Sequence, residues 1–374
     1  MQLLFGILSS QAPSYAWMLV FRGCVGLGLG GVPQAVTILT EVVPLQRRGT
    51  FLTFLGFFWT FGAVLAGVLA LVVIDALNWR YYLLVLLCPL VMFLIGSWWM
   101  PESPRYLFIT EQTTKLKALV EKIAKINGKT VPQETITQVQ ITTRGRVTDL
   151  FVKELRWTTL LLCCMWFTTI FCHYGIVLLT TKMFQTGING CTAHLPPHST
   201  TSPSGCKRLT NKDYRDFTAT SFAGVPGLLL NLFLIDTIGR KLCLAIEFGV
   251  ASVSTLVLMV CSTRTVLVVF LFVVRGMLHA IVNILYIYTG EVYPTNVRAI
   301  GLGCGSMFAR FGSIVTPFVA QVLIHRSFRT VVVVYAAPLV LCVVASLMLK
   351  TETNQKPLED SSDAALKSNS DILD

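Results

Sequence analysis

Residues 41–48 read Glu41-Val-Val-Pro-Leu-Gln-Arg-Arg48, and residues 291–298 read Glu291-Val-Tyr-Pro-Thr-Asn-Val-Arg298. Each copy ends an apolar run that carries an Arg-Gly pair earlier, at Arg22-Gly23 and at Arg275-Gly276. Two copies of one pattern indicate a chain made of two related halves. Membrane proteins built from two such helical bundles commonly hold a solute site between the bundles. The repeat therefore predicts a two-bundle membrane protein.

The composition agrees with lipid as the solvent for most side chains. Apolar residues make up 54% of the chain and charged residues only 13%, and the mean hydropathy is +0.68. Soluble proteins usually contain about 25% charged residues. The formal net charge of +11 does not indicate a nucleic-acid partner, because the basic residues lie in short loops between apolar runs. Such residues orient membrane helices.

Nine stretches have the roughly 20 largely apolar residues that a transmembrane helix needs. They lie near residues 15–40, 50–75, 81–99, 157–181, 217–236, 242–262, 265–290, 300–324 and 329–349. Residues 1–13 are too short to span a bilayer. They lack the basic start of a signal peptide, so we interpret them as the end of an interrupted span.

The loops predict the orientation and the organisation of the chain. Lys and Arg are about twice as frequent in the loops of one side, which we therefore expect to be cytoplasmic. The expected parts are an incomplete N-terminal bundle at 1–99, a cytoplasmic linker at 100–156, a six-helix C-terminal bundle at 157–349 and a disordered cytoplasmic tail at 350–374. Apolar residues at helical spacing within TKLKALVEKIAKI at 114–126 predict an amphipathic helix on the membrane surface, with a ligand-binding module as the alternative.

Most of the eleven cysteines lie inside apolar stretches, where Cys acts as a small hydrophobic residue. Cys191 and Cys206 differ, because they share the non-cytoplasmic 182–216 loop. An oxidising compartment would allow a disulfide between them, with free thiols as the equal alternative. His194 and His198 lie in the same loop at irregular spacing, so we expect no metal site.

Several motifs carry a family resemblance over residues 1 to about 350. FRGCVGLGLGGVPQ at 21–34 resembles the fourth helix of the major facilitator superfamily, and PESPR at 101–105 resembles the signature that ends the sixth. DTIGRK at 236–241 resembles the motif between helices eight and nine. With EVVPLQRRG, EVYPTNVRA and RWTTLLL at 156–162, the set resembles the synaptic-vesicle-two-related branch. The resemblance implies an all-α two-bundle fold of twelve helices and transport of a small organic solute, an organic ion, by alternating access.

The departures from the family pattern are equally informative. The first two helices and the Gly-Asp-Arg loop are not found, so the resemblance implies a truncated form, such as an alternatively spliced isoform, lacking about two and a half helices. The alternative function is therefore a non-transporting isoform with a regulatory role or none. Residues 217–230 contain no acidic residue where the resemblance implies a Glu, and Gly224 lies there. We therefore do not predict that Gly224 takes part in ion coupling.

Charged residues within spans cost about 2.5 to 3.5 kcal/mol at a helix centre on insertion scales, and they usually pair or face a cavity. Arg22, Arg275 and Arg310 lie within expected spans. Each contacts an anionic solute, or it binds a neighbouring helix or reaches the interface. Further polar residues that the expected solute path offers are Gln34, Thr37, His173, Tyr174, Asn231, Asn283 and Tyr286. An interhelical hydrogen bond is the alternative role for each.

A second set of charged residues lies at the expected cytoplasmic helix ends. By the resemblance, Asp236 or Glu291 pairs with Arg240 or Arg298 and so holds one conformational state. Simple salt bridges at helix ends are the alternative. The full set of motif residues is Glu41, Arg48, Glu102, Arg105, Asp236, Arg240, Glu291 and Arg298.

Catalytic signatures do not accompany the spans. We find no Ser-His-Asp order, nucleotide-binding loop or metal-ligand cluster, so we expect neither an enzyme nor a cofactor. The expected partners are the lipid bilayer, a small organic solute and a coupling ion. The sequence leaves open the solute, the coupling ion, the oligomeric state, and whether the membrane is that of a vesicle or the cell.

Overall fold

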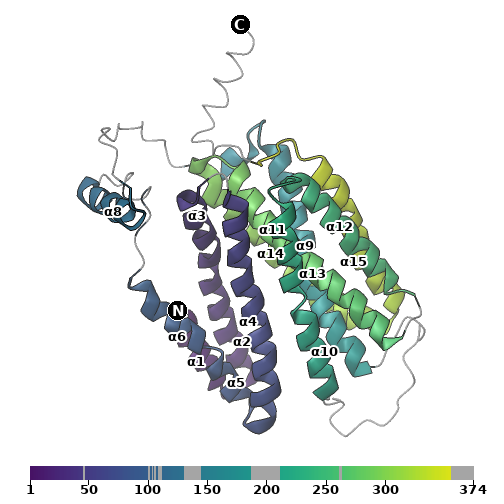
Figure 1. Ribbon diagram of the computed structural model, residues 1–374. Coiled ribbons are helices and arrows are strands. Elements are labelled where there is room, and N and C mark those ends of the chain that lie inside the picture. Colours follow the sequence, from purple (N-terminus) through teal and green to yellow (C-terminus); the bar gives the residue numbers. More distant parts are fainter. Residues whose placement is uncertain are drawn as a thin grey trace. The chain divides into compact units, whose positions relative to one another are not determined.

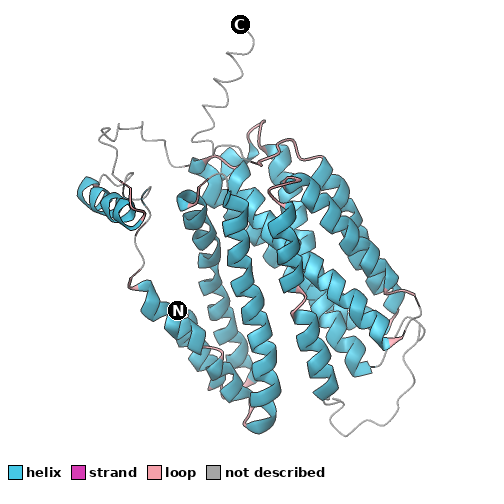
Figure 2. Cartoon of the chain, viewed as in Figure 1, coloured by secondary structure: helices cyan, strands magenta, loops and turns pink. Residues whose placement is uncertain are grey.

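The computed structural model describes residues 1–44, 47–99, 102, 104, 107, 112–129, 145–186, 211–260 and 263–354. Within these residues the regular secondary structure is helical (Figure 2). The chain forms two compact units. The first contains Met1–Val42 and Trp79–Arg144, and the second contains Val43–Asn78 and Gly145–Asp374. Figure 1 labels the helices of both.

The first unit is built around short helices. They are α1 (Gln2–Ser10), α2 (Tyr15–Gly28), α3 (Val32–Val42), α5 (Trp79–Val85), α6 (Cys88–Ser97) and α8 (Thr113–Ile126). The start of the chain, interpreted from the sequence as the end of a span, forms α1 and packs against α2 and α5. Gly6 permits this approach, because a Cβ atom there would lie 2.6 Å from the Leu87 side chain. Helix α8 forms where the apolar spacing predicts it, and Leu116 on that face is buried.

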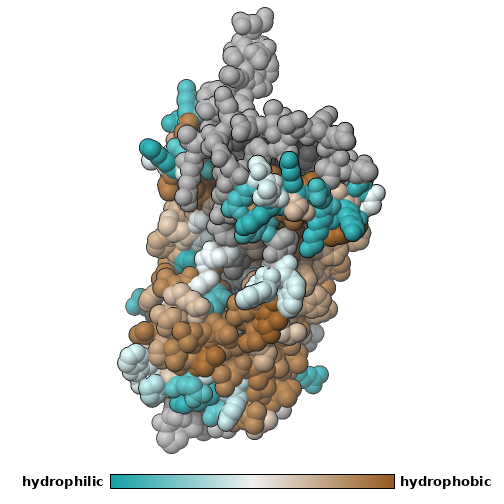
Figure 3. Space-filling model, turned by 90° about the vertical axis from the view of Figure 1, so that its left-hand side faces the viewer, coloured by the Kyte–Doolittle hydropathy of each residue, from teal (hydrophilic) through white to brown (hydrophobic). Residues whose placement is uncertain are grey.

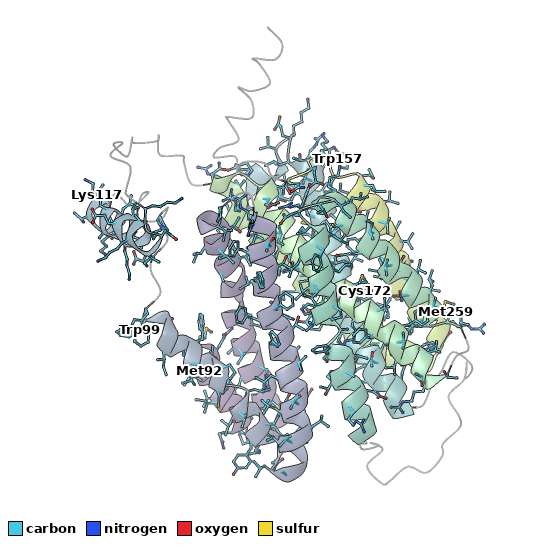
Figure 4. All side chains as sticks on the ribbon, viewed as in Figure 1. Met92, Trp99, Lys117, Trp157, Cys172 and Met259 are labelled. Atoms are coloured by element: carbon cyan, nitrogen blue, oxygen red, sulfur yellow. The ribbon has the colours of Figure 1, made fainter. Side chains whose placement is uncertain are left out.

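The second unit is a bundle of long helices. They are α4 (Arg48–Ala76), α9 (Arg156–Thr186), α10 (Asn211–Ser221), α11 (Gly224–Leu234), α12 (Arg240–Val257), α13 (Arg264–Val292), α14 (Thr295–Pro317) and α15 (Phe328–Leu347). Large side chains such as Trp166 and Tyr335 fill its interior. Cys172 points into this interior (Figure 4), where its thiol lies 3.4 Å from the carbonyl oxygen of Tyr335. Helix α4 packs against α10, α11 and α13. The predicted bundle and linker boundaries at 99 and 157 stay predictions.

Within the described part of the chain, eight segments are long and apolar enough to cross a membrane, and they match eight of the nine predicted stretches. The ninth, near 242–262, coincides with α12, an 18-residue helix that carries Arg240, Lys241 and Glu247. These charges keep it out of the eight, although it packs on two of them, α13 and α15. Hydrophobic residues cover a broad area of the face in Figure 3, with hydrophilic residues toward its ends. The chain is therefore a multi-pass membrane protein.

The helix surfaces carry the side chains expected beside lipid. Met92 on α6 and Trp99, two residues after the end of α6, project outward (Figure 4) and are exposed by 74% and 75%. At the start of α9, the guanidinium carbon of Arg156 lies 5.9 Å from the ring centroid of Trp157. Trp residues near basic residues are common at membrane interfaces, so α9 begins at such a boundary.

Candidate solute site and charge cluster

The span at Arg215–Leu234 is broken in the middle, where α10 ends at Ser221 and α11 begins at Gly224. Pro226 has no amide hydrogen, so it cannot donate a helical hydrogen bond to the carbonyl of Phe222. Gly227 brings the broken span against α13, because a Cβ atom there would lie only 2.3 Å from the Gly276 carbonyl oxygen. Broken helices in transporters expose backbone polar groups at the depth where solutes bind.

Arg275 of α13 binds the end of α10 at this break. Its Nη1 atom donates to the Thr220 hydroxyl at 2.6 Å, and its Nη2 atom donates to the Ser221 hydroxyl at 2.9 Å. The guanidinium carbon lies 5.0 Å from the Phe217 ring centroid. The side chain is 9% exposed. These partners are all neutral, so they satisfy the donors of Arg275 without neutralising its charge.

Two histidines lie beside this arginine. His279 follows Arg275 by four residues and therefore shares its face of α13. The His279 Nε2 and Thr60 Oγ1 atoms are 2.9 Å apart, which joins α13 to α4. The centroid of the His173 ring, on α9, lies 5.8 Å from the centroid of the His279 ring and 5.4 Å from that of the Tyr174 ring. His279 and Thr60 were not predicted from the sequence, although the four-residue spacing of His279 from Arg275 is a signal for that histidine.

Gly224 lies against the same pair of side chains. A Cβ atom at this position would lie 2.8 Å from Thr60 Oγ1 and 3.2 Å from His279 Cδ2. The space where the family resemblance implies a glutamate is thus filled by a threonine and a histidine. An acidic side chain could enter only if both moved.

The remaining predicted path residues of the second unit have different surroundings. Tyr286 lies edge-on to Trp166, with ring centroids 4.6 Å apart. Asn283 donates to the Leu52 carbonyl at 3.4 Å, which links α13 to α4. Asn231 is fully buried and donates to the Ala280 carbonyl at 3.0 Å, which is a hydrogen bond between α11 and α13. Arg310 is exposed on α14.

Three predicted path residues belong to the first unit. Arg22 is exposed on α2, within electrostatic range of Tyr82 on α5. Thr37 is half-buried on α3. Gln34 also lies on α3, and its side chain is outside the described part of the structure. Their part in a solute path stays a prediction.

Arg240 is the centre of a buried charge cluster. Its Nε and Nη2 atoms donate to the two carboxylate oxygens of Glu291 at 3.1 and 3.2 Å. Its Nη1 atom lies 3.2 Å from Oδ1 of Asp236, whose other carboxylate oxygen accepts from the Thr50 hydroxyl at 2.9 Å. Arg48, at the start of α4, lies within electrostatic range of Glu291. The cluster joins α4, α12 and α13.

The chain after α15 also binds this cluster. The Glu352 carboxylate accepts from the backbone N–H groups of Arg240 and Lys241 at 3.0 and 3.1 Å, at the start of α12. The Thr353 hydroxyl donates to Glu291 at 2.7 Å, and Tyr288 donates to the Thr351 carbonyl at 2.7 Å. These residues begin the predicted disordered tail, and composition alone gave no signal of their docking.

Two further motif residues, Arg298 and Glu102, have side chains that the structure describes. Arg298 is buried at the start of α14, and Glu102 is exposed. Arg105, Cys191 and Cys206, and the side chain of Glu41, lie outside the described residues, so the disulfide stays a prediction. The eight cysteines that are described carry free thiols, and the described residues hold no group of three or more metal-binding side chains.

Comparison with known families identifies the class of protein. A family model described as "Sugar (and other) transporter" matches residues 2–189, and one described as "Major Facilitator Superfamily" matches residues 217–371. The fold agrees with a solved structure of the proton:xylose symporter XylE bound to 6-bromo-6-deoxy-D-glucose, with a TM-score of 0.68 and 16% identity. That match covers 96% of this chain and 81% of the symporter. The molecule therefore has the fold of a membrane transporter.

Curated relatives narrow the family. The synaptic vesicle 2-related protein of Xenopus laevis is 42% identical over 96% of this chain and 66% of its own length. The corresponding protein of Rattus norvegicus is 39% identical with the same coverage. SVOPL of Homo sapiens is 31% identical over 95% of this chain and 74% of its own length. The chain belongs to the major facilitator superfamily, in the branch of the synaptic vesicle 2-related proteins.

Two details of these comparisons qualify the match. Identity is higher to the synaptic vesicle 2-related protein of Xenopus laevis than to SVOPL of Homo sapiens. The chain spans 66% of the length of the Xenopus laevis relative.

Proposed function

We propose that this protein is a secondary carrier that moves a small organic anion across a membrane by alternating access. The observation that supports the proposal most strongly is Arg275. Its guanidinium is 9% exposed, lies at a helix break and has only neutral hydrogen-bond partners among the contacts described above. A buried cation without a carboxylate partner favours an anionic ligand beside it.

The distribution of charged residues within the candidate spans also favours an anionic solute. Within the eight candidate spans, acidic residues occur at Asp216 and Glu291, both at span ends. Arginines occur deeper, at Arg22, Arg275 and Arg310. A surplus of positive charge in a low-dielectric region raises the local concentration of anions. The neutral alternative is a sugar, which the description of one matching family model suggests, but a sugar would leave the Arg275 charge uncompensated.

Polar groups further along α13, and polar groups on α9, would position such a solute. His173, Tyr174, His279 and Tyr286 supply ring nitrogens and hydroxyls on two helices, α9 and α13. A carboxylate or sulfonate solute would bind the guanidinium with two parallel hydrogen bonds, which are stronger than neutral ones. The solute would compete with the Thr220 and Ser221 hydroxyls for these donors.

The cytoplasmic charge cluster would then control access. The pairs of Arg240 with Glu291 and Asp236 hold α12 to α13 in the present conformation. Alternating access requires interfaces that can break and form again. We therefore propose that these pairs hold one state of the carrier and separate in the other.

Uptake into proteoliposomes tests the proposal. The panel consists of radiolabelled aromatic carboxylates and sulfonates, quaternary amines of matched size, and a monosaccharide as the neutral member. We expect saturable uptake of at least one anion and little uptake of the amines. Saturable uptake confined to the amines or the sugar would contradict the anion assignment, and no saturable uptake of any member would contradict the carrier assignment.

A further inference from the structure

Glu247 is a buried carboxyl group that the solute site and the charge cluster do not use. It lies in α12, its side chain is 1% exposed, and neither carboxylate oxygen has a hydrogen-bond partner in the described structure. Glu291 provides a contrast, because both of its oxygens accept from Arg240. Buried polar groups in proteins almost always have partners, so this exception requires an explanation.

The titratable groups on α12 do not supply a counter-charge. Cys243, one helical turn before Glu247, lies within electrostatic range of it. Its thiol is neutral or, when ionised, negative. Arg240 lies seven residues before Glu247, about 10 Å along the helix, and it is engaged by Glu291 and Asp236. Lys241 lies six residues before Glu247, about 9 Å along the helix.

The helices packed against α12 are α13 and α15. On α13, Tyr288 donates to the Thr351 carbonyl, and the Glu291 carboxylate binds Arg240. On α15, the Tyr335 hydroxyl donates to the Thr316 carbonyl at 3.5 Å, and Cys342 is a buried thiol. These groups have other partners or no positive charge, so none of them stabilises an ionised Glu247.

An unpaired carboxylate loses its hydration when it is buried, and this loss is far more costly than retaining a proton. Glu247 is therefore neutral while α12 is packed as described. The same helix is held at its first turn by Glu352 and by the Arg240 pairs. Separation of those pairs would release the first two turns of α12, which end near Glu247.

We propose that Glu247 is a proton-binding site whose occupancy is linked to the packing of α12. The carboxyl group holds its proton while α12 is packed on α13 and α15. When the charge cluster opens and water reaches the helix, the O–H bond breaks, the proton passes to water, and the carboxylate remains on Glu247. This inference rests on the separation of the charge cluster proposed above, but its tests use no solute, so they can fail independently of the anion assignment.

The first test is the pH dependence of thermal unfolding of the purified protein, compared with Glu247→Gln. Glutamine has the same shape and stays neutral. In the unfolded chain an ordinary glutamate is ionised at neutral pH, so the folded protein binds one more proton than the unfolded one. Its stability must then fall as pH rises. We expect the unfolding midpoint of the wild type to fall more steeply than that of Glu247→Gln between about pH 5 and about pH 8.

The second test uses Cys243 as a native reporter of α12 packing. Its thiol is 1% exposed, so alkylation by a membrane-permeant maleimide requires α12 to open. The alkylated Cys243 peptide is quantified by mass spectrometry in the wild type and in Glu247→Gln. We expect the ratio of the wild-type rate to the variant rate to rise several-fold with pH. The direct effect of a carboxylate on a nearby thiol acts in the opposite direction, because it disfavours the reactive thiolate.

The two measurements decide the proposal together. A steeper wild-type pH dependence of unfolding and a rising alkylation ratio support it. Equal pH dependence in the two proteins would overturn it, because Glu247 would then hold no extra proton in the folded state. A constant alkylation ratio would also overturn it, because proton loss would then be unconnected with the packing of α12.

Discussion

Arg240 and Glu291 form a two-point ion pair that joins the first residue of α12 to the end of α13. The Nε to Oε2 distance is 3.1 Å and the Nη2 to Oε1 distance is 3.2 Å. The two side chains are 1% and 4% exposed. When a buried pair loses one partner, the other charge is left desolvated, so the single change costs more than removal of both.

Removal of either partner should therefore destabilise the protein. We expect Arg240→Gln and Glu291→Gln each to lower the free energy of unfolding by about 3 to 5 kcal/mol. The double variant should lose less than the sum of the two. Thermal unfolding in detergent, analysed as a double-mutant cycle, measures this difference. Additive losses would show that the two groups do not interact.

Glu352, which follows α15 in the chain, should stabilise the start of α12. Its carboxylate accepts from two backbone N–H groups there, so it acts as an N-terminal cap. Loss of a cap costs about 0.5 to 2 kcal/mol, and we expect a loss in this range for Glu352→Ala. Glu154→Ala, at an exposed glutamate, is the matched control. Equal melting temperatures for the two variants would exclude a capping role.

Gly227 should tolerate no side chain. Its Cβ would lie 2.3 Å from the Gly276 carbonyl oxygen, so Gly227→Ala must separate α11 from α13. Gly249 lies in α12 with no neighbouring heavy atom within 4 Å of its Cβ position. Gly249→Ala should therefore be neutral or stabilise the protein by up to about 1 kcal/mol through helix propensity. The prediction fails if Gly227→Ala melts as high as Gly249→Ala.

The hydrogen bond between Thr60 and His279 should contribute to the packing of α4 on α13. Thr60→Val removes the hydroxyl and keeps the shape, so we expect a loss of about 0.5 to 1.5 kcal/mol. Thr53 is also buried on α4, but its described hydrogen bond goes to the Gly49 carbonyl of its own helix. Chemical denaturation measures the free energy of unfolding of both variants. A larger loss for Thr53→Val than for Thr60→Val would contradict the role given to the hydrogen bond between Thr60 and His279.

The sequence predicted the helical membrane fold well, because transmembrane spans depend on local composition. Eight of the nine predicted stretches coincide with candidate spans, and the ninth coincides with the more charged α12. The pairing of Arg240 with Asp236 and Glu291 could also be predicted, since the motif residues lie at helix ends. Two roles were predicted for Arg275; the structure shows its hydrogen bond to the neighbouring helix α10, and contact with a solute stays a proposal.

Other features could not be predicted because they depend on long-range packing. Glu352 binds residues more than a hundred positions earlier in the chain, and no local pattern marks it. Glu247 interrupts an apolar run in the sequence, but only the structure shows that its carboxylate has no partner. Gly224 was predicted as the position of a missing acid, and only the structure shows Thr60 and His279 filling that space.

Removing the positive charge at position 275 tests the proposed anion carrier most directly. The measurement is uptake of the best-transported organic anion by Arg275→Gln and Arg275→Lys, compared at equal amounts of folded protein. Arg264→Gln is the control, because Arg264 forms a partly exposed ion pair with Asp216 at the end of its helix. We expect Arg275→Gln to lower kcat/KM by about tenfold or more, a loss of about 1.4 kcal/mol or more, with partial retention in Arg275→Lys and little change in the control. Unchanged anion uptake by a folded Arg275→Gln protein would contradict the account.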